Sequence, residues 1–305
     1  MNRSADTWSE QAKRIPGADE AALRRSVSRA RVHGDSRSRI RAQLALAQAW
    51  QKEGQYRRAG LLLRLTLASA ETEYGPRSTE VAAICNAWAM VGKYAGTFEL
   101  AEALYRRSLA ILEELHGPWH ASVAAVCHNI GGLLHAQGEH ARGEPWARRS
   151  VVIRERLMGP DHPHTAADRA AWAALLEGLG RYQQAREILQ RTLDAYLQMY
   201  GEEHYETAIT WHNLAALAHR SGDLDAARVG YERALRAKER VLGPGHPECA
   251  VTVVNLAALH RDAGEAAQAL ALYRRAVDVL EPAVAPGHPV LMAARAGVES
   301  STVVQ

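Results

Sequence analysis

The sequence predicts an all-α fold, a right-handed superhelical solenoid of helix–turn–helix repeats. The main observation is a fixed period, because glycines recur every 42 residues in two separate series. The first series is Gly54, Gly96, Gly138, Gly180, Gly222 and Gly264, and the second is Gly75, Gly117, Gly159, Gly201 and Gly243. Apolar residues recur at helical spacing between these glycines, and only 6% of the chain is aromatic, which suits helices that pack through small residues. Self-similarity at such a period indicates a repeat array.

The first helix of a repeat is expected over residues 206–220. Its apolar positions, spaced i, i+3, i+4 and i+7, are Trp211, Leu214, Ala215 and Ala218. This spacing places them on one face of a helix. The other repeats also have Ala or Gly at the position of Ala215, so neighbouring helices can approach closely. Gly222 follows, and glycine readily adopts the left-handed conformation that ends a helix.

The second helix of the same repeat follows directly, with Asp223 as its predicted N-cap. Its apolar stripe consists of Ala227, Tyr231, Ala234 and Leu235. Gly243 ends this helix, and Pro247 fits the first turn of the next one, where a missing N–H does no harm. Neither helix can bury its stripe alone, so successive repeats must stack on one another to complete the core.

The repeat resembles a known family. A small residue, a glycine, then a small residue and an aromatic are typical of tetratricopeptide repeats, although their usual period is about 34 residues. The loop Gly-Pro-x-His-Pro at 159–163 and 243–247, and the Asn-Leu-Ala at 213–215 and 255–257, are similar to the tetratricopeptide domain of kinesin light chains and its bacterial relatives. The resemblance covers roughly residues 34–290. It implies a scaffold that binds partner peptides in a concave groove and has no catalytic activity.

The period divides the chain into four expected regions. They are an N-terminal arm and capping helix at 1–33, a degenerate repeat at 34–74, five 42-residue repeats at 75–284, and a C-terminal capping helix and tail at 285–305. Residues 18–32 of the arm are predicted to be helical, and this helix either caps the first repeat or docks on another molecule. Pro145 falls early in the second helix of its repeat, which predicts that this helix starts late or bends.

Charge and composition narrow the class of partner. The net charge of the chain is +3. Residues 1–40 contain nine Lys/Arg and five Asp/Glu and so carry a net charge of +4, which leaves the array itself nearly neutral. We therefore expect no nucleic acid partner, because such binding usually needs a basic face. The chain has no apolar run long enough to cross a membrane, and its polar N-terminus is not typical of a secretory signal. We expect no membrane association.

The three cysteines do not form the pattern of a disulfide framework. Cys85 and Cys127 lie one period apart, at the same core-facing position of neighbouring repeats. We interpret them as buried free thiols. Such cysteine usage favours a reducing compartment, so the predicted location is cytoplasmic.

The first helices of the repeats are expected to line the concave face. The candidate partner-binding residues on them are His128, Asn129, His135, Glu177, His212, Asn213, His219, Arg220, Asn255 and Arg261. An asparagine side chain donates and accepts at once, so Asn129, Asn213 and Asn255 could hold the backbone of an extended peptide. The resemblance implies the same role for the asparagine of the Asn-Leu pattern. The alternative is that these asparagines bond neighbouring helices, and Ala87 and Ala171 interrupt the series.

The histidines of this face suggest two further hypotheses. His135, Glu177 and His219 occupy one position in three successive repeats, and such groups can ligate a metal. Neighbouring helices lie roughly 8–10 Å apart or more, so convergence is not favoured, and we expect no metal and no cofactor. The second hypothesis is that the histidines, with Arg220 and Arg261, recognise acidic side chains of a peptide at lower pH.

A further series of histidines recurs every 42 residues in the loops: His120, His162, His204, His246 and His288. Each stands at the entrance to a helix, where we expect it to bond a free backbone group or pack on the next loop. The chain has no Gly-x-x-x-x-Gly-Lys-Ser/Thr, His-Glu-x-x-His, Gly-x-Ser-x-Gly or Cys-x-x-Cys motif. We therefore expect no enzymatic activity.

The resulting hypothesis is an adaptor that binds a peptide or helix of a partner protein in the concave groove. Two alternatives stay open. One is a regulatory subunit that sequesters an enzyme or transcription factor, with the basic arm as a second contact. The other is a structural scaffold that self-associates through its terminal repeats. The sequence leaves the oligomeric state open.

Overall fold

The structure is a computed structural model that describes residues 18–32, 34–283 and 287–302. All its regular elements within these ranges are α-helices. The first are α2 (Ala18–Val32), α3 (Ser36–Lys52), α4 (Tyr56–Tyr74), α5 (Thr79–Ala95), α6 (Phe98–His116), α7 (Ala121–Ala136) and α8 (His140–Met158). They are followed by α9 (Pro163–Gly178), α10 (Tyr182–Tyr200), α11 (Tyr205–Arg220), α12 (Leu224–Leu242), α13 (Pro247–Asp262), α14 (Ala266–Leu280) and α15 (Pro289–Thr302). Most of the predicted arm and the end of the predicted tail lie outside the described residues.

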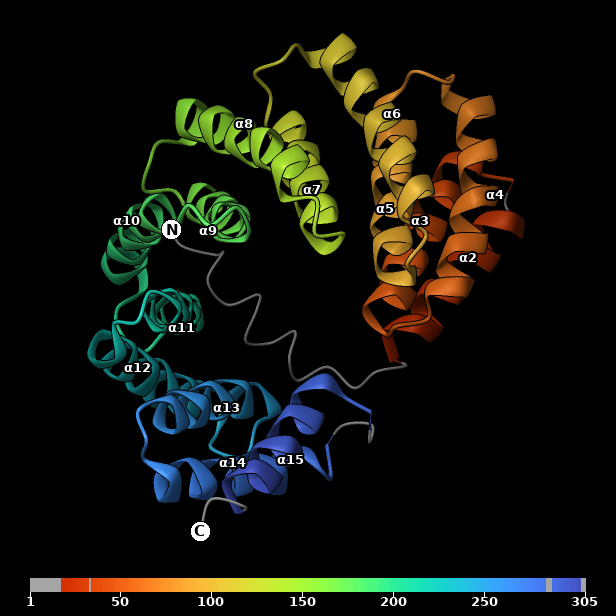
Figure 1. The fold of residues 1–305 in the computed structure, drawn as a ribbon. Coiled ribbons are helices and arrows are strands. Elements are labelled where there is room, and N and C mark those ends of the chain that lie inside the picture. Colours follow the sequence, from red (N-terminus) through yellow and green to blue (C-terminus); the bar gives the residue numbers. More distant parts are fainter. Residues whose placement is uncertain (1–17, 33, 284–286, 303–305) are drawn as a thin grey trace. The chain divides into compact units, whose positions relative to one another are not determined.

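The helices form two compact units, residues 1–153 and residues 154–305. In the first unit each helix from α2 to α7 packs against the next one in the chain, and in the second unit the same holds from α9 to α15 (Figure 1). The first helices of successive pairs also touch, as α5 does α7 and α11 does α13. This is the packing of a helix-pair repeat array, so the predicted all-α repeat fold is confirmed. The handedness of the array stays a prediction.

The ends of the helices are set by glycine and by capping side chains. Gly222 after α11 and Gly243 after α12 have φ angles of 81° and 91°, which a residue with a Cβ rarely adopts. Asp223 is the N-cap of α12, because its carboxylate accepts a hydrogen bond from the backbone N–H of Ala226 at 3.2 Å. Pro247 stands in the first turn of α13. The boundaries that these residues predict are therefore confirmed.

The loop histidines act as N-caps. Nδ1 of His120, His162, His204 and His246 accepts a hydrogen bond from the backbone N–H two residues later, at 3.2–3.3 Å. This confirms the expected bond to a free backbone group for four of the five positions. His288 makes no such bond within the described residues. A nitrogen that accepts cannot carry a proton, so these imidazoles cap their helices in the neutral form.

Small residues bring the helices together, as the sequence predicts. Ala215 of α11 is 1% exposed. A Cβ added to Gly230 of α12 would lie only 2.8 Å from the Cβ of Ala215. Gly131 of α7 lies similarly close to Ala147 of α8. Cys85 and Cys127 are fully buried free thiols, which confirms their predicted place in the core.

Of the two outcomes predicted for α8, the late start is wrong, and a bend at Pro145 stays a prediction. The helix begins at His140, the same repeat position as Tyr182 of α10, and it continues through Pro145. Proline lacks the N–H that would bond the carbonyl four residues earlier. Here Pro145 and Ala141 are both exposed, so water can satisfy that carbonyl and the helix need not be broken.

Helix α2 packs on α3, which is the arrangement expected of a capping helix. The indole N–H of Trp50 donates a hydrogen bond to Glu20 at 2.8 Å, and the guanidinium of Arg24 lies 5.6 Å from the centre of the indole ring. Whether α2 also contacts another molecule stays a prediction.

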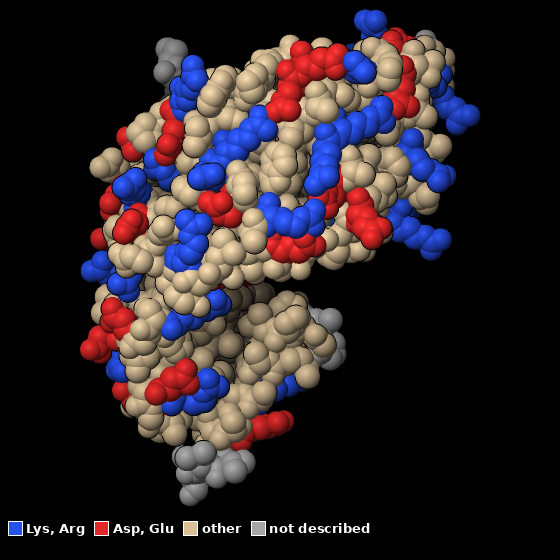
Figure 2. Space-filling model, turned by 45° about the horizontal axis from the view of Figure 1, so that its top comes forward, with Lys and Arg blue, Asp and Glu red and all other residues tan. Residues whose placement is uncertain are grey.

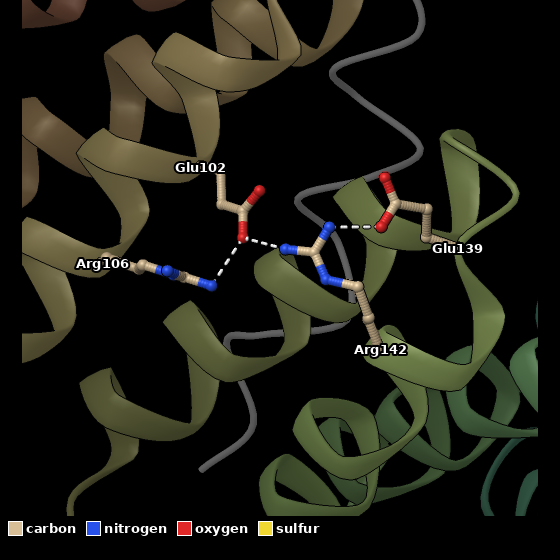
Figure 3. A network of polar contacts seen from close by, with 4 residues as sticks. All are labelled: Glu102, Arg106, Glu139 and Arg142. Atoms are coloured by element: carbon tan, nitrogen blue, oxygen red, sulfur yellow. Dashed lines mark hydrogen bonds and ion pairs between the residues drawn. The ribbon is translucent and has the colours of Figure 1, made fainter.

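Ion pairs tie the second helices of successive repeats together. Glu102 of α6 accepts from Arg142 of α8 at 2.7 Å, although the two residues are 40 positions apart in the chain (Figure 3). The same carboxylate also accepts from Arg106, one helical turn along α6, while Arg142 bonds Glu139. These two repeats are therefore linked by polar contacts between their second helices.

Candidate partner-binding surface

The candidate residues all lie on first helices of the repeats. They are His128, Asn129 and His135 on α7, Glu177 on α9, His212, Asn213, His219 and Arg220 on α11, and Asn255 and Arg261 on α13. The residues on α7 belong to the first compact unit and the others to the second. We describe the two groups separately.

On α11 and α13 the polar side chains bond from helix to helix. Nε2 of His212 lies 3.1 Å from the amide nitrogen of Asn255, and Nδ1 lies 3.1 Å from the hydroxyl of Thr252. The amide nitrogen can only donate, so Nε2 accepts and Nδ1 carries the proton. Burial, together with the charge of Lys238, lowers the pKa of His212 to about 4. His212 is therefore a neutral link between two helices at physiological pH.

The charged candidates of this unit are paired with one another or with neighbours. Nε2 of His219 lies 3.0 Å from a carboxylate oxygen of Asp262, and Arg220 forms an ion pair with Glu177 at 2.7 Å. Arg261 pairs with the adjacent Asp262 at 2.9 Å. The two arginines are each paired with a carboxylate, so a partner that used either would have to exchange one ion pair for another.

The three asparagines differ in their surroundings. The amide nitrogen of Asn129 donates to the side-chain oxygen of Asn86 on α5 at 2.8 Å, and Asn255 bonds His212 as described. Both therefore bridge neighbouring helices, as the alternative interpretation has it. Asn213 is half-buried, and its side chain makes no hydrogen bond within the described part of the chain. Its binding of a partner stays a prediction.

On α7 the candidates face a cationic environment. His128 is half-buried and His135 is exposed, with its ring 5.1 Å from that of His140. Desolvation lowers the pKa of His135, and the charges of His140 and Lys93 lower it further. Lys93 on α5 lies over the ring of Tyr94. Its surroundings therefore favour the neutral imidazole, in which one ring nitrogen donates a hydrogen bond and the other accepts one.

Sequence reasoning missed the residues that complete these contacts, above all Thr252 and Asp262. A signal for them exists in the spacing. Four pairs that join successive first helices, Asn86–Asn129, Glu177–Arg220, His212–Asn255 and His219–Asp262, are each 43 residues apart. In these four pairs a residue on one first helix thus bonds the residue on the next first helix that lies one period plus one position, 43 residues, later in the chain. Comparing the sequence with itself at 43 residues rather than 42 would have paired them.

The described residues contain no group of three or more His, Cys, Asp or Glu placed to hold a metal ion. His219 and Glu177, both named in the metal hypothesis, are instead bonded to Asp262 and Arg220. Among the described helices none is long and apolar enough to cross a membrane. Acidic and basic side chains alternate over the face in view in Figure 2, as the nearly neutral charge of the array predicts.

Stacked helix pairs with polar contacts between successive first helices define a helical repeat protein. A family model described as tetratricopeptide repeat matches residues 122–198, 167–240 and 206–281, which together span more than half of the chain. The chain belongs to the tetratricopeptide repeat family, whose arrays generally mediate protein–protein interactions. No curated protein matches the sequence significantly.

Solved structures with the same fold include two related to kinesin light chains. BtubC (BKLC) from P. vanneervenii is 21% identical, with a TM-score of 0.60, over 82% of this chain and 94% of that chain. A putative kinesin light chain of Podosopora anserina with nearly identical repeats is 22% identical, with a TM-score of 0.59, over 67% of this chain and 97% of that chain. The pilF protein of Pseudomonas aeruginosa is 16% identical, with a TM-score of 0.55, over 87% and 97%. The predicted resemblance in fold is confirmed.

Proposed function

We propose that this protein is an adaptor that binds a peptide or helix of a partner protein along the first helices of its repeats, the face that the resemblance identifies as a concave groove. The observation that carries the proposal is Asn213, a half-buried amide with no side-chain hydrogen bond among the described residues. Its amide atoms are not among the fully buried side-chain atoms without a partner in the described residues, so they stay accessible to a ligand. A bound peptide backbone would supply both the donor and the acceptor that this amide lacks.

The neighbouring contacts support this role because they hold the surface in place. Asn255 uses its amide nitrogen to bond His212 and keeps its oxygen available, while His212 is fixed on its other side by Thr252. Side chains that are fixed in this way lose little entropy when a ligand binds. In the second unit the surface therefore offers the fixed side-chain oxygen of Asn255 and the amide of Asn213.

A pull-down from the native host tests the proposal. The baits are the wild type, the variant Asn129→Ala/Asn213→Ala/Asn255→Ala, and the control Gln268→Ala, which removes an exposed amide from α14. Circular dichroism confirms that all three are equally folded. We expect the wild type and the control to capture the same partner and the triple variant to lose it. Equal capture by all three would place the binding site elsewhere and refute the proposal.

A further inference from the structure

A pocket of about 280 Å³ lies in the second compact unit, and its lining includes no candidate residue of the partner-binding surface. It opens between α12 and the loop that precedes α11. Its lining includes Trp211, Arg233, Arg236 and Arg240, with Glu202 and Glu203 at the loop side. The three arginines are spaced i, i+3 and i+7, so they share one face of α12. We call this site the arginine pocket.

The repeat pattern explains why one of these arginines is unpaired. In three other repeats an arginine at the position of Arg233 bonds a glutamate 36 residues earlier: Arg107 bonds Glu71, Arg149 bonds Glu113, and Arg275 bonds Glu239. In the fourth, Glu155 precedes Arg191 by 36 residues but bonds Arg169 instead. For Arg233 the residue 36 positions earlier is Leu197. Arg233 makes no ion pair within the described residues, and its guanidinium lies 5.9 Å from the centre of the Trp211 ring.

The other positions of the pocket are also particular to this repeat. Arg236 stands where other repeats have Val152, Asp194 and Asp278, and it is 3.8 Å from its nearest carboxylate, Glu232. Arg240 pairs with Glu203 across the mouth of the pocket. Among the described residues the pocket therefore contains one unpaired and one weakly paired guanidinium. Arg233 keeps the arginine of its repeat position but lacks the glutamate 36 residues earlier, and Arg236 stands at a position where the repeats just named have no arginine.

The same place in the first compact unit carries different chemistry. There a pocket of about 500 Å³ is lined by Trp119, Val152 and Ile153, with Arg149 at the position of Arg233. Arg149 is engaged by Glu113, and Arg148, which also lines this pocket, lies 3.9 Å from Glu144. The remaining lining residues are apolar. The repeat backbone thus forms a hollow at this position, and the side chains of each repeat decide what it can bind.

The geometry favours a small, doubly charged anion. Guanidinium groups present paired N–H donors that match the oxygens of a phosphate, and several arginines together stabilise its two charges. A nucleic acid base is excluded from stacking in the pocket, because Trp211 is only 6% exposed and lies beneath Arg233. Glu202 and Glu203 would repel the neighbouring charges of a long polyanion or of an anionic membrane.

We propose that the arginine pocket binds a phosphorylated side chain of a partner protein. The site uses none of the asparagine contacts of the proposed partner-binding surface, so it stands or falls separately from that surface. Phosphorylation of the partner would then switch this contact on, since the unmodified hydroxyl is uncharged and forms only neutral-acceptor hydrogen bonds, whereas a phosphate offers three oxygens and about two negative charges.

Titration calorimetry with a short phosphopeptide tests the proposal directly. The probe is the capped tripeptide Ala-phosphoserine-Ala, and the same tripeptide with serine is its control. We expect the wild type to bind the phosphopeptide with a Kd of about 1 mM or tighter, as two or three charge-assisted bonds allow, and not to bind the serine form. Equal binding of both forms, or no binding of the phosphopeptide at several times that concentration, would overturn the proposal.

Matched arginine variants show whether the binding occurs in this pocket. Arg233→Gln should weaken phosphopeptide binding by roughly tenfold or more. Arg191→Gln removes an exposed arginine at the same repeat position on α10 and should leave the affinity unchanged. If both variants bind as the wild type does, or lose affinity equally, the pocket is not the site.

A second pair of variants tests the repeat argument without removing an arginine. Leu197→Glu supplies the carboxylate that other repeats have, so it should engage Arg233 and weaken binding as much as Arg233→Gln. Leu197→Gln is the control, since it changes the packing in the same way but leaves Arg233 unpaired, and it should keep the wild-type affinity. Two other ligands are tested in the same way, a single-stranded RNA oligonucleotide and vesicles that contain phosphoinositide. The proposal would be overturned if the wild type bound either of them more tightly than the phosphopeptide and Arg233→Gln lost that binding. The pocket would then be assigned to that ligand.

Discussion

Single residues on the first helices have two tasks, joining successive helices and contacting a partner. His212 shows the first task clearly, because both of its ring nitrogens bond α13. The sequence places His212 on the right face but does not show that it is neutral and engaged. Its partners lie 40 and 43 residues away, and a repeat pattern read at 42 residues does not align them.

The state of His212 predicts how stability depends on pH. Its pKa in the folded protein is about 4, against about 6.5 in the unfolded chain, so the folded state disfavours protonation. The stability that depends on its neutral form is complete above pH 6.5 and is lost as the pH falls toward 4. Between pH 7.5 and 4.5 the loss should be about 2 kcal/mol.

Urea unfolding of the wild type and of His212→Gln at these two pH values measures the effect. Other histidines, among them His162 and His204, also have a lowered pKa, so both proteins should lose stability in acid. We expect the wild type to lose more, by the amount assigned to His212. Parallel pH profiles for the two proteins would contradict the neutral, buried role of this imidazole.

At the scale of the helix, the sequence predicts most of what the structure shows. The period, the glycine and proline boundaries, the Asp223 cap and the core stripes all follow from local rules that hold within one repeat. The start of α8 does not, because the rule for proline ignores whether the carbonyl it leaves unpaired is exposed to water, and at Pro145 it can be. The polar contacts between helices do not either, since they depend on the stagger of one repeat against the next.

Helix packing predicts opposite effects for the same substitution at two glycines. A Cβ at Gly230 would lie 2.8 Å from that of Ala215, so Gly230→Ala forces α11 and α12 apart. The gain in helix propensity is about 1 kcal/mol, and overpacking costs about 1–3 kcal/mol, so we expect a net destabilisation of about 1 kcal/mol. At Gly60 of α4 the nearest atom is 3.7 Å away, and Gly60→Ala should stabilise the protein by about 0.5 kcal/mol.

Denaturant unfolding of both variants beside the wild type measures this contrast. The substitution is the same and both glycines lie within helices, so a difference in sign must come from the space around them. If Gly230→Ala proved as stabilising as Gly60→Ala, the close approach of α11 to α12 would be wrong.

Helix capping by the loop histidines leads to a further prediction. His246→Ala removes the acceptor for the backbone N–H of Glu248 and should cost about 1 kcal/mol of stability. His246→Asp keeps an acceptor at the N-cap and should restore most of it. The midpoint of thermal unfolding compares the three proteins, and equal midpoints for the alanine and aspartate variants would show that the cap contributes nothing.

At the scale of the whole molecule, the chain is a row of similar repeats with different surfaces. The repeated positions build the core and the boundaries, and this part could be predicted in full from the period. The same residue at the same repeat position can still differ in what it is free to bind, because its partner in the neighbouring repeat varies, as Asn213 against Asn255 and Arg233 against Arg149 illustrate. Their roles depend on contacts with the neighbouring repeat, so the sequence names the candidate residues without showing which of them are free.

The central claim is that a partner protein bonds the amide of Asn213. The most direct measurement is the dissociation constant of the captured partner, determined by calorimetry for the wild type, Asn213→Ala and the control Gln268→Ala. We predict that Asn213→Ala weakens binding by roughly tenfold, as the loss of buried hydrogen bonds requires, and that the control binds as the wild type does. An unchanged dissociation constant for Asn213→Ala would contradict the account.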